Sequence, residues 1–274
     1  MNRIAEKFAK LKANNQKAFC AYICAGDPDY MTSLEILKNL AMQNVDFIEL
    51  GIPFLDPAGD GPIIEEASRR SISNGMTLKK TIQMVAEFRQ TNSDTPIILM
   101  GYFNPILKYG IENIFIDAKK AGVDAFLIVD LPHEEEDEII NYIKESEIDL
   151  IRLIAPTTSK LRAQKIIKNA SGFLYLISML GTTGTKDAKY EDNISNVAML
   201  KEITDLPISI GFGIKTPEIA QQFCNLNIDN IIVGSSFVDK ISQLSNKNNS
   251  QQKIISEINQ MAQNFIKKIK NAKY

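Results

Sequence analysis

Residues 45–62 read VDFIELGIPFLDPAGDGP, and the fold prediction rests on this stretch. It begins with apolar, β-branched and aromatic residues, which are typical of a strand. It places a carboxylate, Glu49, near the end of that strand. A loop rich in Gly and Pro follows and carries two more carboxylates, Asp56 and Asp60. The stretch therefore predicts a buried strand that ends at an acidic loop.

Similar apolar runs recur along the chain, at 18–26, 96–103, 125–130, 149–156, 172–179, 207–214 and 230–238. Nearly every gap holds a segment of helical periodicity, such as MTSLEILKNLAMQN at 31–44. Runs this apolar suit strands that are buried on both faces, as in a parallel sheet covered by helices. Eight such β–α units predict a (β/α)8 TIM barrel that forms a single domain over 1–274. An open doubly wound sheet is the alternative, but no Gly-rich dinucleotide turn follows the first run.

The two ends of this barrel have different predicted roles. The segment 2–12 predicts an extra N-terminal helix that can cover the bottom of the barrel. Two long gaps follow the second and sixth strands, and they lie at the C-terminal face, where the active sites of such barrels form. The second of these gaps, LGTTGTKDAKYEDN at 180–193, predicts a mobile lid.

Composition excludes several classes of partner. The net charge is −2, so no strong basic field is present to hold nucleic acid or anionic lipid. The three cysteines lack the spacing of metal ligands, and we expect no metal site. No apolar run approaches the length of a membrane span, and the first residues lack the features of a signal peptide. We therefore predict a cytoplasmic protein.

The strand pattern predicts the direction of Glu49. Side chains alternate along a strand, so Phe47 and Glu49 share one face while Ile48 and Leu50 share the other. If Ile48 and Leu50 pack against the outer helices, Glu49 points into the barrel near its mouth. Burial there would raise the pKa of the carboxyl group, which suits a group that both gives and takes a proton. A structural carboxylate held by a backbone N–H or a tyrosine is the alternative.

The second candidate acid is Asp60, on a loop whose glycines and prolines force a tight path. An Asp in such a loop is often only a turn former, so its catalytic role depends on its facing the same mouth as Glu49. Asp56 precedes a proline, which is typical of a turn, and we favour a structural or interface role for it.

Three Gly-rich strand ends predict a phosphate site: GTTG at 181–184, GFGI at 211–214 and GSS at 234–236. Glycines let backbone N–H groups approach an anion, and helix N-termini favour negative charge. We expect helices to begin after Thr216 and at Ser235. The loops after the seventh and eighth strands are the usual phosphate site of such barrels, although ordinary strand-to-helix turns would read the same.

With these motifs placed, the chain resembles the α subunit of tryptophan synthase. The matching pieces follow the order of that family over nearly the whole chain and include AGDPD, IELGIPFLDPAGDGP, YFNPILKYG, DLPHEE, IAPTT, GTTG, PISIGFGIKTPE and IIVGSSFV. The resemblance implies the retro-aldol cleavage of indole-3-glycerol phosphate to indole and glyceraldehyde 3-phosphate, without a metal or organic cofactor. It implies Glu49 as the general acid and base, and Asp60 as the group that binds the indole N–H and stabilises the indolenine tautomer.

The same resemblance implies the other residues of the site. Tyr175 would line the reaction site, and Thr183 would help the lid position Asp60. The indole slot would be formed by Tyr22, Met100, Leu127, Val129, Leu153 and Phe212. Backbone N–H groups of Gly184, Gly213, Gly234 and Ser235 would hold the phosphate.

The resemblance also implies a partner. The family's α subunit binds a β subunit that carries pyridoxal phosphate (PLP), in an allosteric αββα heterotetramer that channels indole. The residues that match its docking loops are Asp56, Pro57, Asn104, Lys108 and Pro132. PLP would belong to the partner and not to this chain.

Two departures from the family pattern affect the active-site loops. Ala58-Gly59 replaces Leu-Ala in the loop that carries Asp60, and the glycine should loosen that loop. The lid begins SMLGTTG at 178–184, where the family usually has Ser-Arg-x-Gly-Val-Thr-Gly, so Met179 stands in place of the arginine and a cation is lost. We therefore predict weak activity alone and strong dependence on the partner, which would order both loops.

Two other functions fit parts of the sequence. Another phosphate-binding barrel of histidine or tryptophan biosynthesis would use different acid and base positions and would lack the DP-x-x-DGP loop. A non-catalytic regulatory barrel could bind phosphate and activate a β subunit without turnover. The presence of both Glu49 and Asp60 argues against this second function, because a protein that only binds needs no buried acid.

Overall fold

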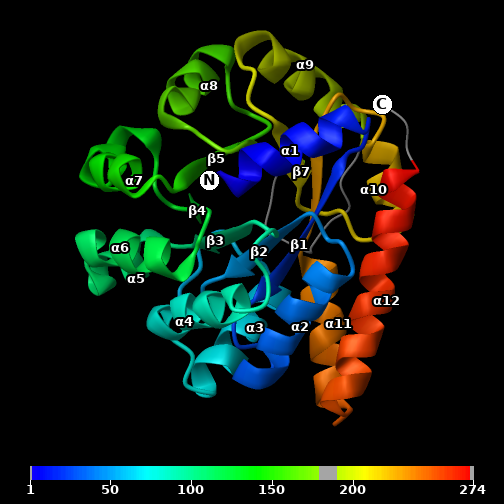
Figure 1. Cartoon of the computed structure of the whole chain (residues 1–274). Helices are drawn as coiled ribbons and strands as arrows, with labels where there is room; N and C mark the ends of the chain where they lie inside the picture. Colours follow the sequence, from blue (N-terminus) through cyan, green and yellow to red (C-terminus); the bar gives the residue numbers. More distant parts are fainter. Residues whose placement is uncertain (1, 179–189, 272–274) are drawn as a thin grey trace.

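A computed structural model describes residues 2–178 and 190–271. Eight parallel strands close into a barrel in chain order, with helices around it (Figure 1). The strands are β1 (Ala18–Cys24), β2 (Phe47–Gly51), β3 (Ile97–Gly101), β4 (Ala125–Ile128), β5 (Asp149–Ile154), β6 (Leu174–Ile177), β7 (Ile208–Gly211) and β8 (Asn230–Val233). Each strand lies within one of the apolar runs, which confirms the predicted TIM barrel.

Helices lie between successive strands, and further helices precede the first strand and follow the last one. Within the described residues they are α1 (Arg3–Ala13), α2 (Tyr30–Met42), α3 (Pro62–Ser73), α4 (Leu78–Arg89), α5 (Phe103–Tyr109), α6 (Ile111–Ala121), η1 (His133–Glu138), α7 (Ile140–Ser146), α8 (Lys160–Ile166), η2 (Ile167–Asn169), η3 (Glu191–Asn193), α9 (Ile194–Ile203), α10 (Pro217–Phe223), α11 (Ser235–Asn246) and α12 (Gln251–Lys270). The three η elements are 3-10 helices. Among these described helices, none is both long and apolar enough to cross a membrane.

The strands separate two apolar layers, as their alternation requires. Ile48 and Leu50 belong to the outer layer between strands and helices. Phe47 belongs to the inner layer, together with Cys20 and Ile98 from the neighbouring strands. The inward face of β2 is therefore the face that carries Glu49, as the sequence predicts.

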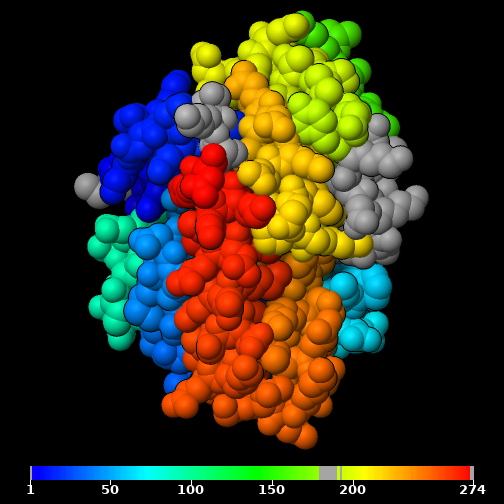
Figure 2. All heavy atoms as spheres, turned by 90° about the vertical axis from the view of Figure 1, so that its right-hand side faces the viewer, coloured from blue at the N-terminus to red at the C-terminus, as the bar shows by residue number. Residues whose placement is uncertain are grey.

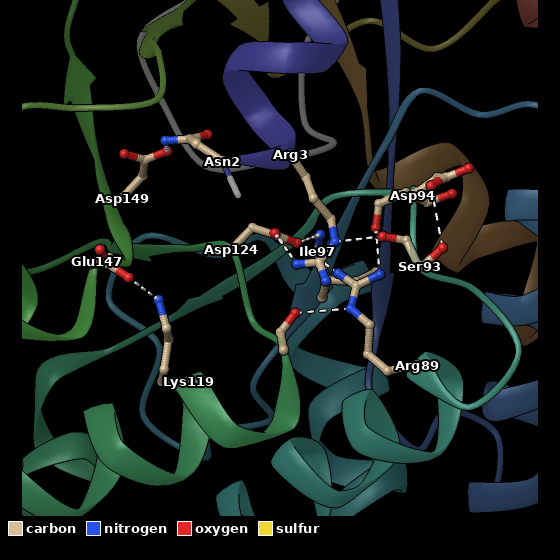
Figure 3. Close-up of polar contacts among 12 residues, drawn as sticks. Asn2, Arg3, Arg89, Ser93, Asp94, Ile97, Lys119, Asp124, Glu147 and Asp149 are labelled. Atoms are coloured by element: carbon tan, nitrogen blue, oxygen red, sulfur yellow. Dashed lines mark hydrogen bonds and ion pairs between the residues drawn. The ribbon is translucent and has the colours of Figure 1, made fainter.

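Helix α1 covers the N-terminal end of the barrel. The ring of Phe8 lies 4.7 Å from the ring of Phe47 and 6.0 Å from that of Phe173, centroid to centroid. At the start of this helix, Arg3 donates to Asp124 over 2.8 Å (Figure 3). Asp124 also accepts hydrogen bonds from Arg89 at 2.6 Å and from the backbone N–H of Ile97 at 2.7 Å. One buried carboxylate thus joins α1, α4 and β3, and the predicted N-terminal helix is confirmed.

The helices at the other end of the chain close the barrel. Thr216 caps α10 by accepting a hydrogen bond from the N–H of Ile219, and α11 begins at Ser235, both as predicted. Helix α12 lies across the outer surface and packs against α2, α10 and α11 (Figure 2). Lys270 near its end donates to Asp46 over 2.7 Å, which ties the helix to the entry of β2.

Candidate active site

A pocket lies at the C-terminal end of the barrel, where the ends of strands from the first and second halves of the chain meet. Its free volume is about 40 Å³. It is lined by Tyr22, Glu49, Asp60, Ile64, Met100, Tyr175, Phe212, Gly213, Ile214, Ile232, Gly234 and Ser235. Both predicted acids therefore face one pocket, together with predicted indole-slot and phosphate residues.

Glu49 is almost fully buried, with 1% of its surface exposed. Neither of its carboxyl oxygens has a hydrogen-bond partner in the part of the chain that the structure describes. Burial raises the pKa of Glu49 to about 8. A carboxylate held only for structure would have been bonded to a backbone N–H or a tyrosine. The arrangement therefore fits a proton donor that waits for a substrate.

Asp60 lies on the loop between β2 and α3, whose first residue is Pro62. Burial raises the pKa of Asp60 to about 6, while a hydrogen bond from the hydroxyl of Tyr102 acts in the opposite direction. Near neutral pH, Asp60 is therefore mostly ionised and Glu49 mostly protonated. The two acids of the pocket are poised in opposite protonation states.

Two tyrosines at the barrel mouth, on β1 and β6, each pack against a glycine on the next strand. Tyr22 pairs in register with Glu49, and a Cβ added to Gly51 of β2 would lie 2.1 Å from the Tyr22 hydroxyl oxygen. A Cβ added to Gly211 of β7 would lie at the same distance from the hydroxyl of Tyr175. The absence of a side chain at these glycines makes room for both rings at the barrel mouth.

The side of the pocket that is predicted to bind phosphate is formed by the ends of β7 and β8. The backbone has positive φ at Phe212 (71°) and at Gly213 (73°), so the chain turns sharply there. Gly234 is the N-cap residue of α11, and no side chain caps the helix there. Gly234 and Ser235 both line the pocket, so the N-terminus of α11 faces it. The predicted Thr183 and Gly184, like Met179-Leu180 and most of the lid, lie outside the described residues.

The remaining residues of the predicted indole slot lie beneath the pocket or in a cavity beside it. Leu127 is fully buried in the inner apolar layer. Val129 and Leu153 line an adjoining cavity of about 590 Å³, and Phe212 lines both this cavity and the pocket. Phe212 also contacts Tyr175 edge to face, with ring centroids 5.7 Å apart.

Sequence reasoning missed several residues near the two acids. Ile64, Ile214 and Ile232 line the pocket. Ile232 could have been found, because alternation along β8 places it on the inner face. Tyr102 follows β3 and bonds to Asp60, and no local pattern indicates this contact between residues far apart in the sequence.

The residues that match docking loops gather on one part of the C-terminal face. They follow β2, β3 and β4, and all except the partly buried Pro57 are exposed: Asp56, Asn104, Lys108 and Pro132. The rings of Phe54 and Tyr102 join the first two loops, with centroids 5.5 Å apart. The N–H of Phe103 donates to Asp130 over 2.7 Å, which joins the second loop to the third.

Across residues 2–178 and 190–271, no group of three or more His, Cys, Asp or Glu side chains is placed to hold a metal ion. The three cysteines are buried and free. The titratable side chains that line the pocket are those of Glu49, Asp60, Tyr22 and Tyr175.

The fold and this pocket define a barrel enzyme whose pocket brings together a buried carboxyl group, a partly buried one and the Gly-rich ends of two strands. The model of the tryptophan synthase alpha chain family matches residues 8–270, and the chain belongs to this family. Its members cleave indole-3-glycerol phosphate to indole and glyceraldehyde 3-phosphate, which makes this protein a lyase of tryptophan biosynthesis. The α chain of the family has no cofactor of its own.

Solved structures agree with this assignment. The chain is 34% identical to tryptophan synthase subunit alpha from Legionella pneumophila, with 99% of each chain covered and a TM-score of 0.91. It is 26% identical to a chain of Mycobacterium tuberculosis tryptophan synthase, with 98% of each chain covered and a TM-score of 0.87. The aminoacrylate-bound form of the M. tuberculosis enzyme gives 25% identity over 97% of this chain and 100% of that chain, with a TM-score of 0.83.

Proposed function

We propose that Glu49 and Asp60 divide the chemistry of indole-3-glycerol phosphate cleavage between the ring carbon and the ring nitrogen. The observation that carries the proposal is that both carboxyl groups line one pocket, where burial raises the pKa of Glu49 to about 8 and that of Asp60 to about 6. A protonated Glu49 can act as an acid, whereas an ionised Asp60 can accept a hydrogen bond and stabilise a positive charge.

In this mechanism Glu49 gives its proton to C3 of the indole ring, and the ring becomes a cationic indolenine. Asp60 accepts a hydrogen bond from the ring N–H and stabilises this cation. Glu49 then takes the proton of the glycerol hydroxyl on the carbon attached to C3. That oxygen becomes the aldehyde of glyceraldehyde 3-phosphate as the carbon–carbon bond breaks, and the bonding electrons return the ring to neutral indole.

The rest of the pocket would hold the two ends of the substrate. Tyr22, Met100, Tyr175 and Phe212 would contact the ring, with Val129, Leu153 and Leu127 behind them. The N–H groups of Gly213, Gly234 and Ser235 would bind the phosphate, and the start of α11 supports this role because helix N-termini favour anions. Thr183 and Gly184 keep their predicted roles in lid closure and phosphate binding.

The test is indole release from indole-3-glycerol phosphate by the wild type and by Glu49→Gln. The substitution keeps the shape of the side chain but removes the exchangeable proton, and turnover should fall by about 10³-fold. Glu66→Gln is the control, because Glu66 is an exposed carboxylate on α3, outside the pocket. Turnover by Glu49→Gln at the wild-type rate would disprove its role. No release by folded wild type would favour the non-catalytic regulatory barrel.

We also propose that the chain binds a tryptophan synthase β subunit in an αββα heterotetramer, through Asp56, Pro57, Asn104, Lys108 and Pro132. The exposure of this face and the links between its three loops support the proposal. PLP would belong to that partner. A single domain over 1–274 acting in the cytoplasm completes the proposal, and the free cysteines are consistent with a reducing compartment.

A further inference from the structure

Tyr102 links the proposed docking face to the catalytic loop. It is the N-cap residue of α5, the helix that presents Asn104 and Lys108 at the surface. Its own side chain is only 3% exposed, so a docked protein cannot contact it. Its ring packs against Phe54, at the start of the loop that carries Asp60. Tyr102 is therefore joined by its backbone to one docking segment and by its side chain to another.

The hydroxyl of Tyr102 holds the same loop at two further points. The backbone N–H of Gly59 donates to this oxygen over 3.1 Å. The hydroxyl in turn donates to the carboxylate of Asp60. Since each hydroxyl has one donor and two acceptor positions, both bonds form at once. The hydroxyl therefore sets the position of Gly59 and the charge environment of Asp60.

The loop approaches Tyr102 closely because residue 59 is a glycine. A Cβ added to Gly59 would lie 3.1 Å from Cγ1 of Val129 and 3.4 Å from the Tyr102 hydroxyl. The backbone of Gly59 is not in the left-handed region, so the glycine serves close approach here. A loop with a glycine directly before Asp60 depends all the more on this outside contact.

We propose that Tyr102 is a positioning residue that couples occupancy of the α5 docking face to the placement of Asp60. The inference rests on the proposed function, since it needs Asp60 to act on the substrate and a β subunit to bind α5. A partner that contacts Asn104 or Lys108 fixes α5, whose N-cap residue is Tyr102. The hydroxyl then holds Gly59 and Asp60 in the arrangement that the indole N–H requires.

The first experiment compares Tyr102→Phe with Tyr109→Phe. Both remove one hydroxyl from the same short helix segment, but Tyr109 bonds to Asp117, away from the pocket. In Tyr102→Phe the ring still packs on Phe54, so the fold should be retained. We expect kcat for indole release to fall about tenfold with KM within about twofold, because the change misplaces a reacting group and not the binding site. Tyr109→Phe should match the wild type.

The pH profile separates positioning from a general loss of packing. Asp60 is faced by Tyr102, by Glu65 of α3, and across the pocket by Tyr22 of β1 and Glu49 of β2. Of these, Tyr102 donates the hydrogen bond that favours the charged form of Asp60. Its removal should raise the pKa of Asp60 and shift the acid limb of kcat/KM upward by roughly one pH unit. An unshifted limb and an unchanged kcat would overturn the positioning role.

The second experiment adds the β subunit. Because Tyr102 is hidden, Tyr102→Phe should bind the β subunit with unchanged affinity but be activated several-fold less than the wild type. Equal activation of the two enzymes would overturn the coupling. Wild type that releases indole but shows no activation also overturns the coupling, whereas wild type that releases none contradicts the proposed function itself. The failures of the two proposals are thus distinguishable.

Discussion

Glu49 and Asp60 owe their raised pKa values to the same cause, burial, yet they lie on opposite sides of neutrality. Glu49 has no hydrogen-bond donor among the described residues, so burial acts on it unopposed. Asp60 has the Tyr102 hydroxyl, which favours its charged form. One neighbouring hydroxyl thus contributes to the difference between an acid that gives a proton and one that stays ionised.

The buried carboxyl group of Glu49 also affects stability. Its folded-state pKa, about 8, lies above its ordinary value of 4.5, so the folded protein holds this proton more tightly than the unfolded chain. The free energy of unfolding should therefore fall as the pH rises from about 4.5 to about 8, by roughly 5 kcal/mol from this group. Glu49→Gln should remove this dependence. Urea unfolding of both proteins at pH 5 and pH 9 measures this dependence. The prediction is contradicted if the difference in free energy of unfolding between Glu49→Gln and the wild type does not widen toward pH 9.

At the level of elements, strands position one acid of the pocket and loops position the other. The register of β1 and β2 places Tyr22 beside Glu49, and the alternation of β2 turns Glu49 inward. The loops after β2 and β3 supply Asp60 and Tyr102, and their contact lies outside the sheet. Rigid strands hold Glu49, whereas Asp60 depends on contacts between loops.

Helix α1 lies at the opposite end of the barrel from the pocket, so we expect it to contribute to stability and not to substrate binding. Phe8→Ala should lower the free energy of unfolding by about 3 kcal/mol, because it removes a buried ring that contacts Phe47 and Phe173. The KM for indole-3-glycerol phosphate should not change at a temperature where the variant is folded. Thermal unfolding together with steady-state indole release tests this expectation. A change in KM would show that the bottom of the barrel communicates with the pocket.

The whole molecule places its catalytic pocket and its proposed docking face on the same end of one barrel. The loop of Asp60 belongs to both, since it also carries Asp56 and Pro57. A partner bound there restrains the loop without reaching the pocket. If the proposed docking is correct, this geometry would make catalysis dependent on assembly.

Turnover should therefore be weak for the isolated chain and rise by at least about tenfold on addition of the β subunit. The measurement is indole release at saturating indole-3-glycerol phosphate while the β subunit is titrated. An isolated chain that already matches its complex would show that the Ala58-Gly59 and Met179-Leu180 departures leave the loops competent.

The sequence by itself determined the barrel, its N-terminal helix, the inward direction of Glu49 and the helix starts at Pro217 and Ser235. Each of these follows from a local period or a capping pattern, which a single stretch of chain contains in full. The folded structure alone decided that Glu49 has no hydrogen-bond partner among the described residues and that Asp60 bonds to Tyr102. It also decided that five of the predicted slot residues line two cavities while Leu127 lies behind them. Burial and neighbouring charges come from segments far apart in the chain. The pKa shifts and the loop contacts therefore arise only once the barrel has closed.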